Sequence, residues 1–166
     1  QAEDGIRYQP RSRGLGDGDK RQGFKSAVGA VYLADCLSSK ETREKYQITV
    51  VYDVAADLQT LEMVKTLQGK VFIPAHAEAT GDIAPLAPLN IDKVHEIAKT
   101  ILSICANPTA FESILQQLFH AFRLTMNFEQ YVLVGSTVRS YLAWLNDAGR
   151  AEYLFEDGQM LWRAKA

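Results

Sequence analysis

Two short stretches decide the fold: VGAVYLAD at residues 28–35 and VFIPAH at residues 71–76. Both begin with an apolar run too short for a helix, which predicts buried strands. The first run ends at Asp35 and the second at His76. Ligand-binding groups gather at the carboxyl ends of strands in open α/β sheets. We therefore expect Asp35 and His76 at adjacent strand ends, about 3–6 Å apart, as ligands that share a metal cluster would be.

Helical patterns lie between the two predicted strands. The capping-box pattern of Ser38 with Glu41 predicts a short helix over residues 40–46. Apolar residues then recur every three positions over residues 58–67, which predicts one apolar helical face. This order of strand, helices and strand indicates an α/β core that spans residues 23–90.

A change of composition marks the end of this core. Residues 79–90 contain two prolines and one glycine and are expected to form an extended linker. Apolar residues at helical spacing then predict a connecting helix over residues 91–106, closed by Pro108. The last predicted domain comprises residues 107–166.

Residues 107–166 have the pattern of a small winged helix-turn-helix domain. A second capping box, Thr109 with Glu112, is expected to begin the first of three helices, and Gly149 to end the third. Asp157-Gly158 stands between two short strand-like segments, which is a strong signal for a two-residue hairpin turn. Three helices followed by a hairpin is the order of elements in that domain type.

The segments around Asp35 and His76 resemble the second half of the metallo-β-lactamase fold hydrolases. In that family one strand delivers an aspartate that bridges two metal ions, in a (G/A)-D-x-L setting, and a later strand delivers a histidine in a P-x-H setting. Ala34-Asp35-Cys36-Leu37 matches the first setting and Pro74-Ala75-His76 the second. The resemblance covers residues 24–90 and implies the C-terminal half of an αββα sandwich. Some members of the family also carry a C-terminal winged-helix domain.

This resemblance implies that the parent protein is an enzyme, a metal-dependent hydrolase whose dinuclear centre activates water. Asp35 and His76 would be metal ligands, and the ions would be zinc, with manganese or iron as alternatives. The substrate of the parent would be a small molecule or an ester-type compound. The family's H-x-H-x-D-H motif is missing from the printed sequence. Because a zinc site needs three or four protein donors, we expect the fragment itself to be inactive. No catalytic residue is assigned, and the substrate-binding residues are unknown.

Other residues of suitable chemistry have simpler interpretations. Asp53 either caps the helix that comes after it or lines a substrate cleft. Glu78 is either a further ligand or a solvated surface residue. Cys36 is expected to be a buried structural thiol, and His95 and His120 are expected on solvated helix faces.

Residues 1–22 differ in composition from the rest of the chain. They contain four glycines, five Lys/Arg and four Asp/Glu, without helical or strand spacing of apolar residues. We expect a disordered tail or a non-native stretch, since the segment resembles the peptide read from translated sequencing-adapter DNA. In the second case the reading frame is cut near Gly23.

The overall composition limits the function classes. A formal net charge of −2 argues against a nucleic-acid binder that relies on bulk charge. No run approaches the about 18 consecutive apolar residues that indicate a membrane span, so no membrane partner is expected. The two cysteines fit reduced thiols of a cytoplasmic protein. A homo-oligomer is an open option.

Two other interpretations remain open. The chain could be a winged-helix module that binds protein or nucleic acid and has no catalytic role. Residues 107–166 have five Lys/Arg against six Asp/Glu, which favours a protein partner over nucleic acid. The third interpretation is a small α/β domain without catalytic function. An H-x-H-x-D-H motif in upstream sequence would decide for the hydrolase.

Overall fold

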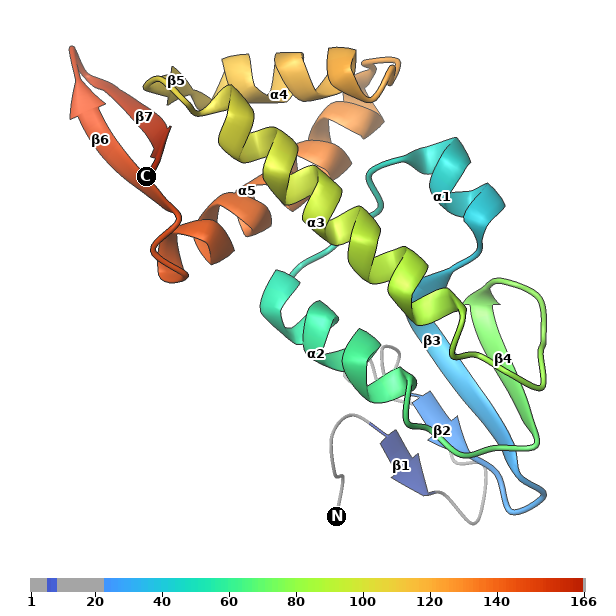
Figure 1. Ribbon diagram of the computed structural model, residues 1–166. Coiled ribbons are helices and arrows are strands. Elements are labelled where there is room, and N and C mark those ends of the chain that lie inside the picture. The colour runs from blue at the N-terminus through green and yellow to red at the C-terminus, as the bar shows by residue number, and fades with distance from the viewer. Residues whose placement is uncertain (1–5, 9–22, 166) are drawn as a thin grey trace. The chain divides into compact units, whose positions relative to one another are not determined.

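A computed structural model describes residues 6–8 and 23–165. The chain divides into two units, one built from residues up to 45 and 56–92, the other from residues 46–55 and 93 onward. The elements are labelled in Figure 1. They are β1 (Ile6–Tyr8), β2 (Gly23–Lys25), β3 (Ala30–Ser38), α1 (Lys40–Tyr46), α2 (Val54–Val64), β4 (Val71–His76), α3 (Leu86–Ile104), β5 (Thr109–Ala110), α4 (Phe111–Ala121), α5 (Phe128–Asp147), β6 (Ala151–Glu156) and β7 (Gln159–Ala164).

The first unit is built on a four-stranded sheet of order β1-β2-β3-β4. β3 is antiparallel to β2 and parallel to β4, and Figure 1 shows β3 and β4 side by side. A parallel pair needs a crossover connection, which here contains α1 and α2. The buried apolar side chains of this unit come from the sheet, α2 and the start of α3; they include Val31, Leu33, Leu37, Leu61, Val64, Phe72 and Ala87.

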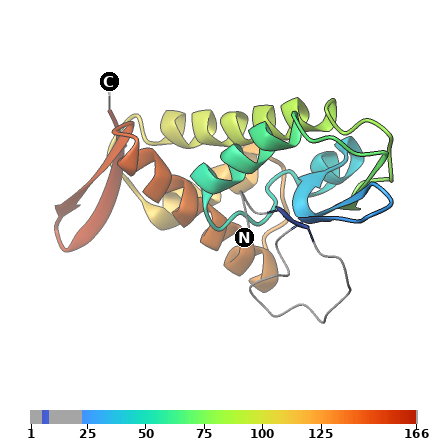
Figure 2. The ribbon, with the colours of Figure 1, turned by 90° about the horizontal axis from the view of Figure 1, so that it is seen from below.

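The second unit combines the later part of α3 with α4, α5 and a three-stranded sheet of order β5-β7-β6. The β6–β7 hairpin comes after α5, as both views show (Figures 1 and 2). Asp157 and Gly158 have φ angles of 47° and 75°, the left-handed conformations that a tight hairpin turn requires. The core of this unit includes Val94, Ile97, Ile101, Leu115, Leu118, Val138, Tyr141, Leu142 and Leu145.

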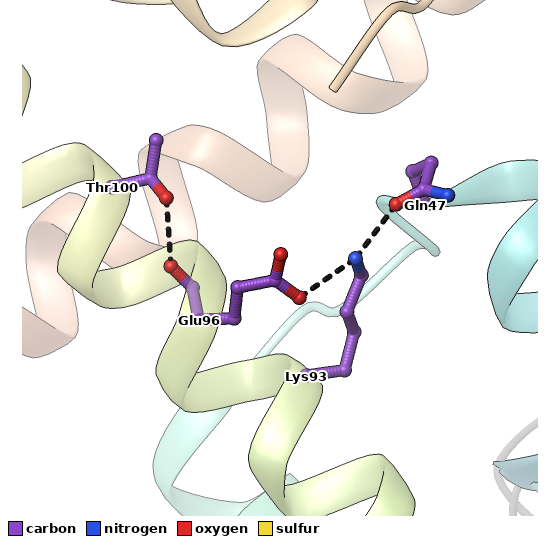
Figure 3. Close-up of polar contacts among 4 residues, drawn as sticks. All are labelled: Gln47, Lys93, Glu96 and Thr100. Carbon is purple, nitrogen blue, oxygen red and sulfur yellow. Dashed lines mark hydrogen bonds and ion pairs between the residues drawn. The ribbon is translucent and has the colours of Figure 1, made fainter. Parts of the chain in front are cut away.

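Residues 46–55 belong to the second unit although they lie between α1 and α2 in sequence. The backbone N–H of Val51 donates a hydrogen bond to Oγ1 of Thr137 at 3.3 Å. Nζ of Lys93 donates to Oε1 of Gln47 at 2.7 Å and also contacts Oε2 of Glu96 at 2.8 Å (Figure 3). These contacts attach the segment to α5 and α3, and it forms no strand.

Several boundaries differ from the sequence predictions in the first unit. β3 does not end at Asp35 but continues to Ser38. The residue whose side chain caps α1 is Ser39, which accepts from the N–H of Thr42, and not Ser38. The predicted linker over residues 79–90 is wrong at its end, because α3 begins at Leu86. Its Pro88 is tolerated because the first-turn N–H groups of a helix have no intrahelical partner.

The predicted helices of residues 107–166 need two corrections. Thr109 lies in β5, and the N-cap of α4 is Ala110 without a side-chain hydrogen bond, so the second capping box is wrong. α5 is one continuous helix of 20 residues where two helices were expected. Asn127 caps its start, and its end before Gly149, whose φ is 68°, agrees with the prediction. Of the predicted tail, Ile6–Tyr8 forms β1, and the other residues of 1–22 lie outside the described part of the chain.

Candidate metal site

The pairing of β3 with β4 is interrupted where the candidate residues lie. Leu33 pairs with Pro74, and the next pair is Ser38 with His76. Between these pairs β3 has residues 34–37 while β4 has Ala75 alone. Such a bulge bends its strand and changes the direction in which side chains point. Asp35 therefore stands on a bulge of the strand.

The bulge brings Asp35 and His76 together. Oδ1 of Asp35 lies 3.2 Å from Nε2 of His76, and their side chains are 69% and 53% exposed. The predicted convergence and separation are thus confirmed. Both side chains are exposed, as the ligands of an open metal site are.

The backbone of His76 is held by the start of α1. Its carbonyl oxygen accepts hydrogen bonds from the N–H of Ser39 at 2.9 Å and from Oγ1 of Thr42 at 3.4 Å. Oγ of Ser39 accepts in turn from the N–H of Thr42 at 3.2 Å. The cap of α1 and the backbone of His76 therefore belong to one hydrogen-bonded network.

A second, buried polar network adjoins it at Ser38 and Arg43. Asn90, on α3, is fully buried and bonds to the backbone of Ser38 through both ends of its amide. Its Oδ1 also accepts from Nε of Arg43 at 2.8 Å. Neither Asn90 nor Arg43 is predicted by the sequence patterns above. The available signal is an amide within the apolar face of α3, since Ala87, Asn90, Val94 and Ile97 lie at helical spacing.

A second carboxylate of the first unit is buried. Burial raises the pKa of Asp57 to about 6, although the charge of Arg43 acts in the opposite direction. Its Oδ2 has no hydrogen-bond partner among the described residues. Burial, and next the charge of Asp57, raise the pKa of the Cys36 thiol to about 11. Cys36 is therefore a protonated thiol at neutral pH and a poor metal ligand or nucleophile.

The remaining candidates stand on the surface. Glu78, His95 and His120 are exposed, the two histidines on α3 and α4. Asp53 is also exposed and directly precedes α2. Within residues 6–8 and 23–165, no group of three or more His, Cys, Asp or Glu side chains is placed to hold a metal ion.

The donor set determines how well a metal fits. A carboxylate oxygen and an imidazole nitrogen are both ordinary ligands of zinc, manganese and iron. Asp35 and His76 present one of each, converging and exposed. Since zinc takes three or four protein donors, this pair fits as part of a ligand set and does not complete one.

The comparisons with known proteins bear on the fold. No protein-family model matches the chain, and no curated protein matches it significantly. Among solved structures, a beta-lactamase domain protein from Burkholderia ambifaria is similar with a TM-score of 0.68 and 16% identity, over 95% of this chain and 53% of that one. A metallo-beta-lactamase family protein from Thermus thermophilus is similar with a TM-score of 0.61 and 12% identity, over 83% of this chain and 42% of that one.

The chain thus spans about half the length of these two structures. At such low identities the likeness concerns the path of the backbone and not the site. None of the helices in the described ranges is long and apolar enough to cross a membrane. The path of the backbone resembles that of metallo-β-lactamase domain proteins, and the chain has part of the metallo-β-lactamase fold.

Proposed function

We propose that this chain is part of a metal-dependent hydrolase in which Asp35 and His76 are two of the metal ligands. The single observation that supports this most is the 3.2 Å approach of Asp35 Oδ1 to His76 Nε2 on a strand bulge, within a metallo-β-lactamase fold. Asp35 and His76 would help to hold the divalent ions of the parent protein, zinc in the first place, with manganese or iron as alternatives. A divalent ion would supply Lewis acidity, polarising the scissile group and acidifying water.

The roles of the chain's own residues depend on their positions. Asp35 offers a carboxylate and His76 an imidazole nitrogen, both on exposed side chains, while Ser39 and Thr42 hold the histidine backbone. We propose that the chain alone binds zinc weakly and hydrolyses no ester, since it presents two protein donors. A small-molecule or ester-type substrate of the parent protein and its cytoplasmic location are part of the same proposal.

Zinc titration followed by NMR of the histidine rings tests this proposal, because the sequence has only three histidines. The ring signals of His76 should shift on addition of zinc, and Asp35→Ala should abolish that shift. His95→Ala, at an exposed histidine of α3, is the matched control and should leave it unchanged. Equal zinc responses in the Asp35→Ala variant and in the unmodified chain would refute the assignment of Asp35 as a ligand. Zinc-dependent ester hydrolysis that Asp35→Ala removes would instead refute the expected inactivity of the chain alone.

A second candidate, a winged-helix module that contacts another protein, is favoured by the order α3-β5-α4-α5-β6-β7 with a sheet of order β5-β7-β6. Exposed apolar side chains of this unit, Phe128 at 82% and Phe155 at 70%, suit a protein partner or a second copy of the chain better than nucleic acid. Cross-linking and sedimentation of the chain, with Phe155→Ser as the variant, test this role. A strictly monomeric chain that captures no protein would count against it.

A further inference from the structure

The side chain of Asn90 is fully buried and satisfied at both ends of its amide. Oδ1 accepts from the N–H of Ser38 at 3.1 Å, and Nδ2 donates to the carbonyl oxygen of the same residue at 3.0 Å. Nδ2 also donates to the carbonyl oxygen of Leu86 at 2.8 Å. The amide thus bonds Ser38 as a neighbouring strand would, at a point where β3 has its bulge.

Ser38 is where the ladder between β3 and β4 resumes. It pairs with His76, and the N–H of the next residue, Ser39, donates to the carbonyl oxygen of His76 at 2.9 Å. A contact that holds Ser38 in place therefore also holds the backbone of His76. It holds the C-terminal end of the bulge as well. The near end of the bulge, at Leu33, is fixed by regular pairing with Pro74.

Arg43 makes this arrangement stiffer. Its guanidinium is buried and donates from Nε to Oδ1 of Asn90 at 2.8 Å. A charged donor strengthens the hydrogen bond, and the cost of burying the charge makes any alternative position of the amide unfavourable. Asn90 is therefore bonded to the end of β3, to α1 and to its own helix α3.

We propose that Asn90 is a positioning residue for the metal ligands: by holding Ser38 it keeps Asp35 and His76 facing each other across the bulge. This inference rests on the proposed function for its purpose, but the positioning itself needs no ion. It predicts that loss of the Asn90 amide separates the two side chains and weakens metal binding about tenfold or more, as removal of outer partners of metal ligands does.

Asn90→Asp is the sharpest variant. It is nearly isosteric and keeps an acceptor for Arg43, so the fold should be retained. Its second oxygen would face the carbonyl oxygens of Ser38 and Leu86, where Nδ2 now donates, and like dipoles repel. Asn90→Ala removes all of these bonds. Thr137→Val is the matched control, because it removes a buried hydroxyl that accepts from a backbone N–H in the other unit.

Two measurements on the full chain are needed. The first is the nuclear Overhauser effect between the Asp35 β-protons and the His76 ring without metal; the second is a titration of the His76 ring signals with zinc alone. Both Asn90 variants should lose the first signal and bind zinc about tenfold or more weakly, and Thr137→Val should change neither. If the signal is lost but the unmodified chain shows no response to zinc, the proposed function fails while the positioning role stands. An unchanged Overhauser effect in Asn90→Asp, or equal losses in Thr137→Val, overturns the proposal.

Discussion

The guanidinium carbon of Arg139 lies 3.7 Å from the centre of the Phe111 ring, a contact between α5 and α4. Nη1 of the same side chain donates to the carbonyl oxygen of Gly135 at 3.2 Å. Arg139 is the only basic residue of the stretch 136–146, where a DNA-recognition helix would lie. The Arg139 guanidinium thus interacts with α4, because a cation over an aromatic face is attracted by the ring.

We therefore expect weak and non-specific interaction with duplex DNA. Residues 107–166 carry fewer basic than acidic side chains, and neutralising phosphates needs several basic groups on one face. Fluorescence anisotropy with a labelled duplex at increasing salt is the measurement, and Arg139→Ala should not alter the result. Tight binding, with an association constant whose logarithm falls steeply with the logarithm of the salt concentration, would show that nucleic acid is a partner.

Gly135→Ala should stabilise the second unit. A Cβ at this position would lie 3.4 Å from Nη1 of Arg139 and 3.6 Å from Leu115, which are ordinary contacts, and the residue is inside α5. Replacing an interior helical glycine by alanine gains about 0.5–1 kcal/mol in the free energy of unfolding. Urea denaturation measures the change.

Gly149→Ala is the matched control. Nothing lies within 4 Å of a Cβ there, but the φ angle of 68° is unfavourable for an L-residue. We expect a loss of about 1–2 kcal/mol. Equal effects of the two substitutions would mean that backbone conformation does not govern either position.

Asp57 should make stability fall as the pH rises through the weakly acidic range. Burial raises its pKa in the folded chain to about 6 from an ordinary 3.8, so between these values the folded state binds more protons than the unfolded one. The contribution of the protonated carboxyl is complete below pH 4 and is lost as the pH rises past 6. At one pKa unit per 1.36 kcal/mol, the loss is on the order of 3 kcal/mol at most.

Asp57→Asn should therefore raise the free energy of unfolding at pH 7 and leave it nearly unchanged at pH 4. Urea denaturation at both values measures this. Glu62→Gln, on the same helix but exposed, is the control and should have little effect at either pH. If Asp57→Asn destabilises the chain at pH 7, the attraction between the ionised carboxylate and Arg43 outweighs the cost of burying the carboxylate.

The N-cap of α5 gives a further prediction. Oδ1 of Asn127 accepts from the N–H of Gln130 at 2.8 Å. Asn127→Ala should cost about 1 kcal/mol in the free energy of unfolding, and Asn127→Asp, which keeps the acceptor, should cost much less. Thermal denaturation followed by circular dichroism compares the two. Equal losses would mean that the cap is not what fixes the start of the helix.

Much of the fold could be predicted from local patterns. The helix over residues 40–46, the two strands that carry Asp35 and His76, and the hairpin turn at Asp157-Gly158 depend on interactions between near neighbours, which spacing and turn chemistry report. The predicted helix start at Thr109 was wrong because strand pairing overrode a local capping pattern, and the start of α3 was placed too late because a proline is tolerated in the first turn of a helix. Thr109 pairs with Trp162, and no local rule contains that contact.

The candidate site was predictable only in part. The convergence of Asp35 and His76 was predicted from two parallel strands that end near each other, but β3 continues to Ser38 and a bulge, which no sequence pattern predicts, sets the position of Asp35. Asn90 and Arg43 could not be found in the same way, because their bonds join residues 47 positions apart. Long-range polar pairs leave no periodic trace in a single sequence.

The bulge of β3 interrupts the alternation of buried and exposed side chains along the strand. Val31, Leu33 and Leu37 are all buried, so a regular strand would turn position 35 toward the core as well. The aspartate there is mostly exposed because the extra residues of the bulge rotate it outward. Desolvating a carboxylate is costly, so turning Asp35 toward the core in a continuous β3–β4 ladder would be unfavourable. An apolar residue in its place would allow the strand to slide into a continuous ladder, and His76 would then face a different neighbour.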